Sequence, residues 1–306
     1  MSSRVARAQC ANCTCSPGLI SRANRKSIYK RLSLNRRNST PGSGSGCTSR
    51  EGSIFTFNPS LCLPDAKEVN TSKRLESLRK QMKEHDLGIY IVPSEDQHQS
   101  EYVSAYDQKR SFISGFSGSA GIAIITRDMN SVGDTFEGTA ALSTDGRYFT
   151  QAVDELDFNW ILLKQGAKDE PTWKEWTIKQ AVQLSLDSGS TVRIGVDPTL
   201  ITYKLYKEFQ SILDKELAKN EKVKIEFTAV KENLINKIWE QFEELPSRNF
   251  GEIKSLDINF TGRNVQDKLA DVKKHLTGDI KGIVISALDE VAWLLNLRGL
   301  DIQYNP

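Results

Sequence analysis

The 306-residue chain has no acidic residue in its first 50 positions, no cysteine after position 62 and no long apolar run. A transmembrane helix needs about 20 consecutive apolar residues, so the lack of such a run excludes a membrane span. The chain also has only three histidines, His85, His98 and His275, and they are far apart in the sequence. We therefore expect a soluble protein with neither a membrane partner nor a histidine pair at metal-ligand spacing.

The cysteines are confined to the start of the chain, at Cys10, Cys13, Cys15, Cys47 and Cys62. The residues that follow cannot be joined by disulfides, which favours a reducing compartment such as the cytoplasm. Cys10, Cys13 and Cys15 are spaced so that they could hold a soft metal ion, but the stretch lacks a fourth ligand. We therefore predict no zinc site there.

The charge of the chain divides into two opposed parts. Residues 1–50 carry ten Lys and Arg and no Asp or Glu, which gives them a charge of +10. Because the whole chain has 41 basic and 39 acidic residues, the remainder has 31 basic and 39 acidic residues and a charge of −8. Residues 1–68 are also rich in Ser, Asn and Gly and contain few clustered apolar side chains, a composition typical of disorder. We predict a disordered basic tail over residues 1–68.

The composition leaves the role of this tail open. An Arg-rich, Ser-rich start without acidic residues is typical of a mitochondrial transit peptide, and an ordinary cytosolic extension has the same features. Aromatic residues do not alternate with the charges, as stacking on nucleic-acid bases requires. We therefore predict no nucleic-acid partner and a cytoplasmic location, with a mitochondrial location as the alternative.

Helical and strand patterns alternate after the tail. Leu75, Leu78 and Met82 recur at helical spacing and predict a helix over 71–86, with Thr71 or Ser72 as its N-cap. The apolar run 89–93 predicts a buried strand. The same alternation predicts strands over 121–126, 140–144, 159–165, 191–197 and 223–230, and helices over 147–156, 171–186 and 200–219. Strands that alternate with helices indicate an α/β fold with helices on the faces of a sheet.

The stretch 243–255, which contains Pro246 and Gly251, predicts a linker between a domain over 69–245 and a second domain over 246–306. In the second domain we expect strands over 255–260 and 281–286 and helices over 264–275 and 287–299. Ser286 and Asp289 form an acidic variant of the capping box at the start of the last helix. So few residues bury too little apolar area to be stable alone, so we expect a truncated domain.

Two glycine- or histidine-containing stretches are candidates for chemistry. The stretch GFSGSAG (115–121) lacks the spacing of a nucleophile elbow and the lysine of a phosphate loop, so we interpret it as a tight turn that leads into a strand. His98 lies between Asp96 and Glu101, a combination that suits acid–base work or a metal. A lone histidine on a loop is more commonly a hydrogen-bonded structural residue.

The stretch TDGRY (144–148) is the third candidate. A turn at Asp145 and Gly146 places Arg147 at the end of a strand, where its guanidinium can bind a carboxylate or a carbonyl in a cleft. The residues alone do not distinguish this role from that of a surface arginine in a turn.

Longer blocks of the sequence resemble one protein family. The chain contains, in this order, IYIVPSEDQHQSEYVSAYDQKRSFISGFSGSAGIAIIT, LSTDGRYFTQAVDELDFNWILLKQG, RIGVDP, VKENLINKIW and ISALDEVAWLLNLRGLDIQYNP. Together, over residues 70–306, they closely resemble the amino-terminal half of aminopeptidase P, the Xaa-Pro aminopeptidase of the cytosolic eukaryotic type in peptidase family M24. The resemblance implies a creatinase amino-terminal-type domain with a mixed sheet and helices on its faces, followed by a truncated second domain of similar type.

The resemblance also implies a function for the full-length family member. That enzyme is a metal-dependent hydrolase that releases the N-terminal residue from peptides with proline in second position, and it holds two divalent ions, usually manganese, in a third domain. The resemblance ends before that domain, so it supplies no catalytic and no metal-binding residue in this chain, and we expect this chain to bind no cofactor by itself. Full-length family members dimerise largely through the missing domain.

One functional position is implied within the chain. The arginine of the family's DGRY motif contacts bound peptide, and it matches Arg147, with Asp145 and Gly146 shaping its turn and His98 as a further candidate. We therefore expect the non-catalytic amino-terminal half of a Xaa-Pro aminopeptidase. The alternative is a catalytically dead binding or regulatory module related to aminopeptidase P.

Overall fold

The structure is a computed structural model that describes residues 70–133, 136–302 and 304. The basic tail predicted over 1–68 and the stretch with Cys10, Cys13 and Cys15 lie outside these residues. None of the helices in the described part of the chain has the length and apolar character that a membrane crossing requires.

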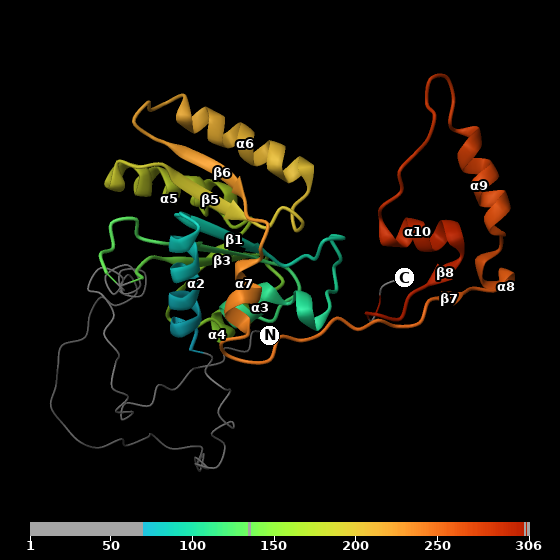
Figure 1. Cartoon of the computed structure of the whole chain (residues 1–306), viewed down its shortest axis with the longest axis horizontal. Helices are drawn as coiled ribbons and strands as arrows, with labels where there is room; N and C mark the ends of the chain where they lie inside the picture. Colours follow the sequence, from blue (N-terminus) through green and yellow to red (C-terminus); the bar gives the residue numbers. More distant parts are fainter. Residues whose placement is uncertain (1–69, 134–135, 303, 305–306) are drawn as a thin grey trace, which may run out of the picture. The chain divides into compact units, whose positions relative to one another are not determined.

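A six-stranded mixed sheet forms the centre of the N-terminal part (Figure 1), with the strand order β4-β3-β2-β1-β5-β6. The strands are β1 (Ile89–Pro93), β2 (Ile122–Thr126), β3 (Ala140–Thr144), β4 (Trp160–Lys164), β5 (Val192–Val196) and β6 (Ile225–Ala229). Strand β2 is antiparallel to both neighbours, whereas the pairs β3–β4, β1–β5 and β5–β6 are parallel. The other five strands therefore run in one direction, and their carboxyl ends lie at the same edge of the sheet.

Helices cover both faces of this sheet, as the sequence predicts (Figure 1). Helices α2 (Ser72–Glu84), α3 (Lys109–Ser114), α4 (Phe149–Glu155) and α7 (Leu234–Trp239) pack on one face, and α5 (Trp173–Ser188) and α6 (Tyr203–Leu217) on the other. Strand β1 serves both cores, because Tyr90 and Val92 join the first and Ile89 and Ile91 join the second. Each such fully buried apolar side chain stabilises the fold by about 1.5–3 kcal/mol. The α/β prediction is thus confirmed.

The start of α2 differs from the prediction in one respect. Thr71 is the N-cap residue, but its side chain makes no capping hydrogen bond. Its amide and hydroxyl instead donate to the Asp157 carboxylate at 2.6 and 2.8 Å, and its hydroxyl accepts a hydrogen bond from the Trp160 indole at 2.9 Å. Thr71 therefore links the first helix to the start of β4 rather than closing the helix end.

The C-terminal part contains a two-stranded antiparallel sheet and three helices. Strand β7 (Lys254–Ser255) pairs with β8 (Leu297–Arg298), and the helices are α8 (Ile258–Thr261), α9 (Val265–Lys274) and α10 (Leu288–Leu295). The strand predicted over 255–260 is wrong beyond Ser255, because Asp257 accepts a hydrogen bond from the Asn259 amide at 2.8 Å and starts a helix there.

Two further predictions for this part are wrong. Residues 281–286 form no strand, since a strand needs a neighbour for its backbone hydrogen bonds and the described residues provide none. The predicted capping box is also absent, because the N-cap residue of α10 is Ala287 and no side chain caps it.

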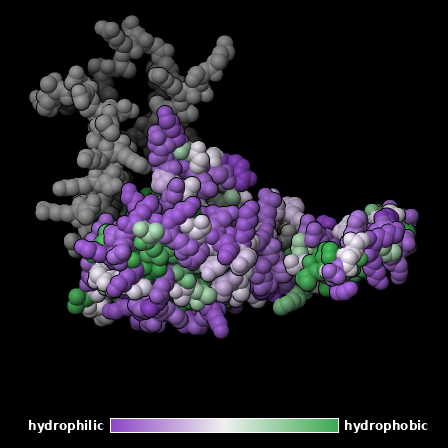
Figure 2. All heavy atoms as spheres, turned by 90° about the horizontal axis from the view of Figure 1, so that it is seen from above, coloured by the Kyte–Doolittle hydropathy of each residue, from purple (hydrophilic) through white to green (hydrophobic). Residues whose placement is uncertain are grey.

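Few apolar side chains of the C-terminal part are buried. Leu294 is the one apolar residue below a tenth exposure among the described residues from 250 onward. Apolar side chains reach its surface (Figure 2), and the large ones that are exposed are Phe250, Ile253, Ile258, Phe260, Leu269, Ile280, Ile283, Val284, Trp293, Leu295, Leu300 and Tyr304. A domain boundary at 245–246 remains a prediction.

Candidate functional site

The turn that carries Arg147 connects β3 to α4. The Asp145 carboxylate accepts hydrogen bonds from the Arg147 amide at 3.0 Å, from its Nε at 3.0 Å and from its Nη2 at 2.9 Å. The Tyr148 amide donates to the Asp145 carbonyl at 3.0 Å and closes the turn. The guanidinium is thus held by a two-point ion pair while 63% of the Arg147 side chain remains exposed.

The ion pair shifts both pKa values in the directions that keep it charged. Hydrogen bonds from Arg147 lower the pKa of the Asp145 carboxyl, and the hydrogen bond and charge of Asp145 raise the pKa of the Arg147 guanidinium. Because both groups lie at the surface, the pair adds little to stability. Its effect is to restrict the orientation of the guanidinium.

Gly146 has no steric requirement for glycine. Its φ lies outside the left-handed region, and an added Cβ would meet only Phe149 Cε2, at the ordinary distance of 3.9 Å. Asp145 therefore accounts for the shape of this turn through its hydrogen bonds.

The Tyr148 ring lies against Arg147 and is itself packed against a second ring. Its guanidinium carbon lies 5.2 Å from the centroid of the Tyr148 ring, and that ring packs edge-on against Phe116 at 5.9 Å. The Tyr148 hydroxyl lies 2.7 Å from the Ser119 hydroxyl. A Cβ on Gly118 would lie 2.3 Å from the Phe116 ring and 2.8 Å from the Tyr148 ring, so a glycine is needed at this close approach.

The glycine-containing loop thus forms the turn that the sequence predicts. Gly115 ends α3 in the left-handed conformation at φ 77°, and the chain then enters β2. Ser117 donates from its amide and its hydroxyl to the Glu155 carboxylate on α4, both at 2.7 Å. The loop 115–121 and the Arg147 turn are therefore joined through α4 as well as through Tyr148.

Arg110 holds this loop through its guanidinium, and no pattern in the sequence predicts this contact. Its Nη1 donates to the Phe116 carbonyl at 2.8 Å, its Nη2 to the Gly118 carbonyl, and its Nε to the Ser94 hydroxyl at 3.0 Å. Burial lowers the pKa of Arg110 to about 10, partly offset by nearby glutamates, so Arg110 remains a cation at neutral pH. Hydrogen bonds to backbone carbonyls leave no pattern in the sequence.

A polar pocket of about 290 Å³ lies beside the loop. Its lining includes Arg110, Ser117, Ser119 and Glu101. Ser119 of this lining contacts the hydroxyl of Tyr148, whose ring lies against Arg147. The charge of the Glu101 carboxylate contributes to the raised pKa of Arg147. The pocket and the Arg147 turn are therefore neighbours, and a polar ligand in the pocket would lie beside the Arg147 guanidinium.

His98 lies on an exposed part of the loop that follows β1. Its amide donates to Asp96 Oδ1 at 2.8 Å, and its ring Nε2 is 3.2 Å from the Gln97 side-chain nitrogen. Among the described residues no hydrogen bond or ion pair joins His98 to Glu101 or to the Arg147 turn. The structure therefore does not gather these residues into one acid–base group.

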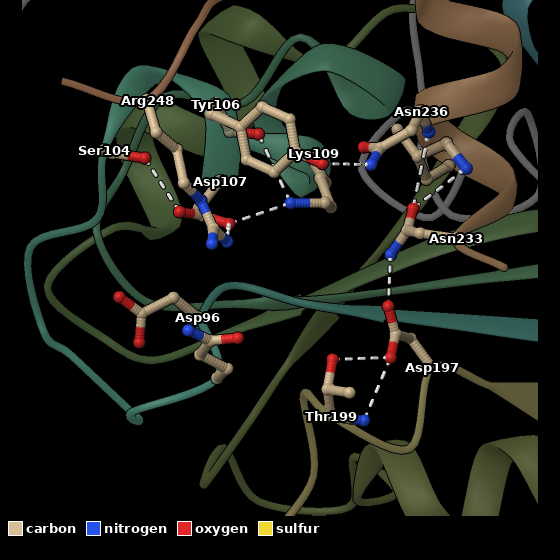
Figure 3. A network of polar contacts seen from close by, with 12 residues as sticks. Asp96, Ser104, Tyr106, Asp107, Lys109, Asp197, Thr199, Asn233, Asn236 and Arg248 are labelled. Atoms are coloured by element: carbon tan, nitrogen blue, oxygen red, sulfur yellow. Dashed lines mark hydrogen bonds and ion pairs between the residues drawn. The ribbon is translucent and has the colours of Figure 1, made fainter. Parts of the chain in front are cut away.

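A buried polar network that no sequence pattern predicts lies at the same edge of the sheet (Figure 3). Asp107 accepts hydrogen bonds from Ser104 at 2.7 Å and from Lys109 and Arg248 at 2.9 Å. Burial opposes the charge of Asp107, but these hydrogen bonds outweigh it and lower the pKa of the carboxyl. The three donors converge on Asp107, which indicates a role in holding the η3 turn (Ala105–Asp107).

The second half of the network fixes α7 to the sheet (Figure 3). Asp197, which follows β5, accepts hydrogen bonds from the Thr199 amide and hydroxyl at 2.9 and 2.7 Å and from Asn233 at 2.9 Å. Asn233 in turn caps α7, because its side-chain oxygen accepts from the amides of Ile235 and Asn236. These contacts explain the position of α7.

No metal-binding group is apparent in the described part of the chain. Across residues 70–133, 136–302 and 304, no three or more His, Cys, Asp or Glu side chains come together in a way that could hold a metal ion. We therefore derive no chemical step through a metal from the polar site around Arg147.

Comparisons with known proteins identify the family. Residues 74–228 match the family described as Creatinase/Prolidase N-terminal domain, and residues 244–306 match a second family with the same description. A putative Xaa-Pro aminopeptidase of Saccharomyces cerevisiae is 45% identical over 317 residues, which cover 97% of this chain and 42% of that protein. A probable Xaa-Pro aminopeptidase P of Verticillium alfalfae is 45% identical and covers 78% of this chain and 35% of that protein.

A solved structure gives the same result. X-prolyl aminopeptidase from Caenorhabditis elegans, described as a cytosolic enzyme with a di-nuclear active site, matches with a TM-score of 0.63 and 31% identity over 78% of this chain and 36% of that chain. The present chain thus spans less than half the length of these relatives. The predicted resemblance is confirmed: the chain belongs to the Creatinase/Prolidase N-terminal domain family and matches the N-terminal portion of Xaa-Pro aminopeptidases.

Proposed function

We propose that this chain is the non-catalytic N-terminal half of a Xaa-Pro aminopeptidase and that it contributes a peptide contact through Arg147. In the complete protein, a metal-dependent site outside these residues would release the N-terminal residue that precedes proline. The observation that carries the proposal is the fixed, outward-facing guanidinium of Arg147 at the end of β3 in a chain similar to Xaa-Pro aminopeptidases.

The geometry of Arg147 suits this role. A guanidinium has five N–H donors, and Asp145 takes the Nε donor and one on Nη2. The donors that remain have no acceptor among the described residues, and they are available to a peptide carbonyl or carboxylate. Because Asp145 restricts the side chain before the ligand arrives, binding costs less rotamer entropy than it would for a free arginine.

The metals belong, in this proposal, to the part of the complete protein beyond this chain. The C. elegans relative is described as having a di-nuclear site, and two divalent ions, manganese in our proposal, would activate water and polarise the scissile carbonyl. The described residues of this chain offer no group of ligands for such ions. We therefore propose that the chain alone does not hydrolyse peptides. As a separate proposal, full-length proteins of this kind form homodimers.

The exposed apolar surface of the C-terminal part supports this assignment. Large apolar side chains such as Phe260 and Val284 are exposed to water, so they do not contribute the stabilising free energy that burial would give. We propose that in the complete protein further residues of the second domain cover them. The description of the C. elegans relative as cytosolic supports a cytoplasmic location, with a mitochondrial one as the alternative.

Two measurements test the proposal. Purified chain, mixed with Arg-Pro-Pro and manganese, should show no release of arginine above background, and sustained turnover would refute the non-catalytic assignment. In saturation-transfer NMR, Arg-Pro-Pro should contact the chain weakly, and Arg147→Ala should reduce the signal severalfold while Arg147→Lys retains part of it. An unchanged signal in Arg147→Ala would remove Arg147 from the peptide site.

The alternative is a binding or regulatory module that acts without catalysis. It is favoured by one observation, an aromatic groove between α6 and β6 that shares no residue with the Arg147 turn.

A further inference from the structure

An aromatic groove lies between the start of α6 and strand β6. Its volume is about 510 Å³, and its lining includes Pro198, Ile201, Tyr203, Tyr206, Phe227 and Ala229. Strands β2, β1 and β5 separate β6 from β3, which precedes the Arg147 turn. The groove therefore shares no residue with the proposed peptide site.

The aromatic rings of the groove form a continuous series from the core to the surface. Phe209 is fully buried, and Phe227 lies 4.8 Å from it. Tyr206 follows at 5.9 Å from Phe227, and Tyr203 at 6.2 Å from Tyr206. Tyr203 is 74% exposed, so the series ends in a ring that makes most of its potential contact area available. Aromatic rings held in this way bind the flat faces of proline and aliphatic side chains at low cost in conformational entropy.

The backbone beside the groove is open on one side. Strand β6 is the last in the strand order, so in the described part of the chain one row of its backbone groups has no neighbouring strand. An edge of this kind accepts an extended peptide as an additional strand. The groove and the edge together therefore suit an extended segment rather than a helix.

The charge around the groove selects for acidic residues in the occupant. Lys207 lies 5.9 Å from the centre of the Tyr203 ring and forms no ion pair among the described residues. Two acidic side chains of these elements are already paired: Glu208 of α6 with Lys174 at 2.6 Å, and Glu226 of β6 with Arg193 at 3.1 Å. The positive end of the α6 dipole adds to the positive potential at the same end of the helix.

The same charge argues against a basic segment of this chain as the occupant. Residues 1–50 carry ten Lys and Arg and no Asp or Glu, so they would be repelled by Lys207. A second copy of the chain that paired through the same edge would bring two Lys207 side chains of like charge toward one another.

We infer that this groove binds an extended, acidic, proline-containing segment of a partner protein. A proline or aliphatic side chain lies on the Tyr203–Tyr206 rings, the partner backbone follows β6, and a carboxylate faces Lys207. The inference is independent of the proposed function, because it does not involve Arg147.

The probe for a direct test is a fluorescein-labelled, blocked decapeptide of alternating proline and glutamate, and fluorescence polarisation measures its binding to the whole chain. A matched decapeptide of proline and lysine is the control ligand. We expect saturable binding of the acidic peptide below about 1 mM and none of the basic peptide. Absence of saturation with the acidic peptide, or equal binding of both, would overturn the inference.

Variants on α6 locate the binding surface. Tyr203→Ala, which removes an exposed ring, should weaken binding about tenfold, and Lys207→Glu should weaken it more at low salt than at high salt. Lys215→Glu makes the same charge change on an exposed residue two turns further along α6 and should leave binding unchanged. Equal effects of Lys207→Glu and Lys215→Glu would indicate attraction by net charge alone.

Two further measurements separate this inference from other outcomes. Arg147→Ala should bind the acidic peptide normally, so that a failure of the proposed function leaves this test intact. Sedimentation should show the same oligomeric state for the wild type and Tyr203→Ala. A dimer that Tyr203→Ala dissociates would identify a second copy as the occupant and refute the partner we propose.

Discussion

Replacing Gly118 by alanine should destabilise the N-terminal sheet and move Tyr148. An added Cβ would lie 2.3 Å from Phe116 Cζ and 2.8 Å from Tyr148 Cδ1, whereas carbon atoms pack at about 3.5–4.0 Å. Phe116 is fully buried in the core, so its ring has no space into which it can turn. One of the two rings must therefore shift by more than the packing allows without strain.

The expected magnitude follows from two opposing effects. Overpacking of a core costs about 1–3 kcal/mol, and the loss of glycine's freedom in the unfolded chain returns about 0.4–1 kcal/mol. The net effect of Gly118→Ala is a destabilisation of about 1–2 kcal/mol. Gly146→Ala is the matched control, because its Cβ meets only Phe149 at 3.9 Å, and it should leave stability unchanged or raise it slightly.

The assay is urea unfolding followed by far-UV circular dichroism, with the midpoints of the two variants compared at equal slope. Because the Arg147 guanidinium packs against the Tyr148 ring, a shift of that ring in Gly118→Ala should also weaken the Arg-Pro-Pro signal in saturation-transfer NMR. If Gly118→Ala unfolds at the wild-type urea concentration, or if Gly146→Ala loses as much stability, the steric reasoning is wrong.

Three further predictions concern stability. Hydrogen bonds lower the pKa of Asp107, so its carboxylate stabilises the fold fully above the unfolded pKa of about 3.9. That stabilisation is lost as the pH falls through the folded pKa. Asp107→Asn should therefore lower the urea midpoint at neutral pH and have little effect at strongly acidic pH. Lys268 is buried and donates to the Trp293 carbonyl at 2.7 Å and to Asn296 at 2.6 Å, so Lys268→Met should speed hydrogen exchange over α10, and unchanged exchange would contradict a capping role. In the wild type, amides over 255–302 should exchange faster than those over 71–230, and equal protection would count against an incomplete domain.

The sequence predicts the six strands of the central sheet well because each is a short segment rich in apolar or β-branched residues. In β1, β2 and β3 nearly every side chain is buried, so the apolar composition of each strand is enough to predict it. Helices α3 and α7 were missed because each has only six residues, too few to establish a helical period. Their position depends on contacts that are distant in sequence, such as the stacking of Phe112 on Trp239 at 4.3 Å.

The errors in the C-terminal part arise where a local pattern depends on its surroundings. The apolar stretch 281–286 has the composition of a strand, yet strand formation depends on a neighbouring strand, and the described residues supply none. Likewise, Ser286 and Asp289 have the spacing of a capping box, but the helix begins after Ala287, so the spacing alone did not fix its start.

The candidate site was predictable only at its centre. The turn after a strand made Arg147 a candidate, and the resemblance of its DGRY motif to that of the family implied the peptide contact. Arg110 and Gly118 were not found, since one acts through backbone carbonyls and the other through the close approach of two rings. Neither kind of contact depends on a recognisable neighbour in the sequence.

The direction of the strands links the two proposed binding surfaces. Because only β2 is antiparallel, β3 and β6 both end at the same edge of the sheet, where open α/β sheets bind ligands. The Arg147 turn follows β3 and the aromatic groove adjoins β6, with β2, β1 and β5 between them. A peptide at Arg147 and a partner in the groove would therefore approach the same edge without competing for a residue. Simultaneous binding of Arg-Pro-Pro and the acidic decapeptide should thus be additive, and mutual displacement would show that the two surfaces form one site.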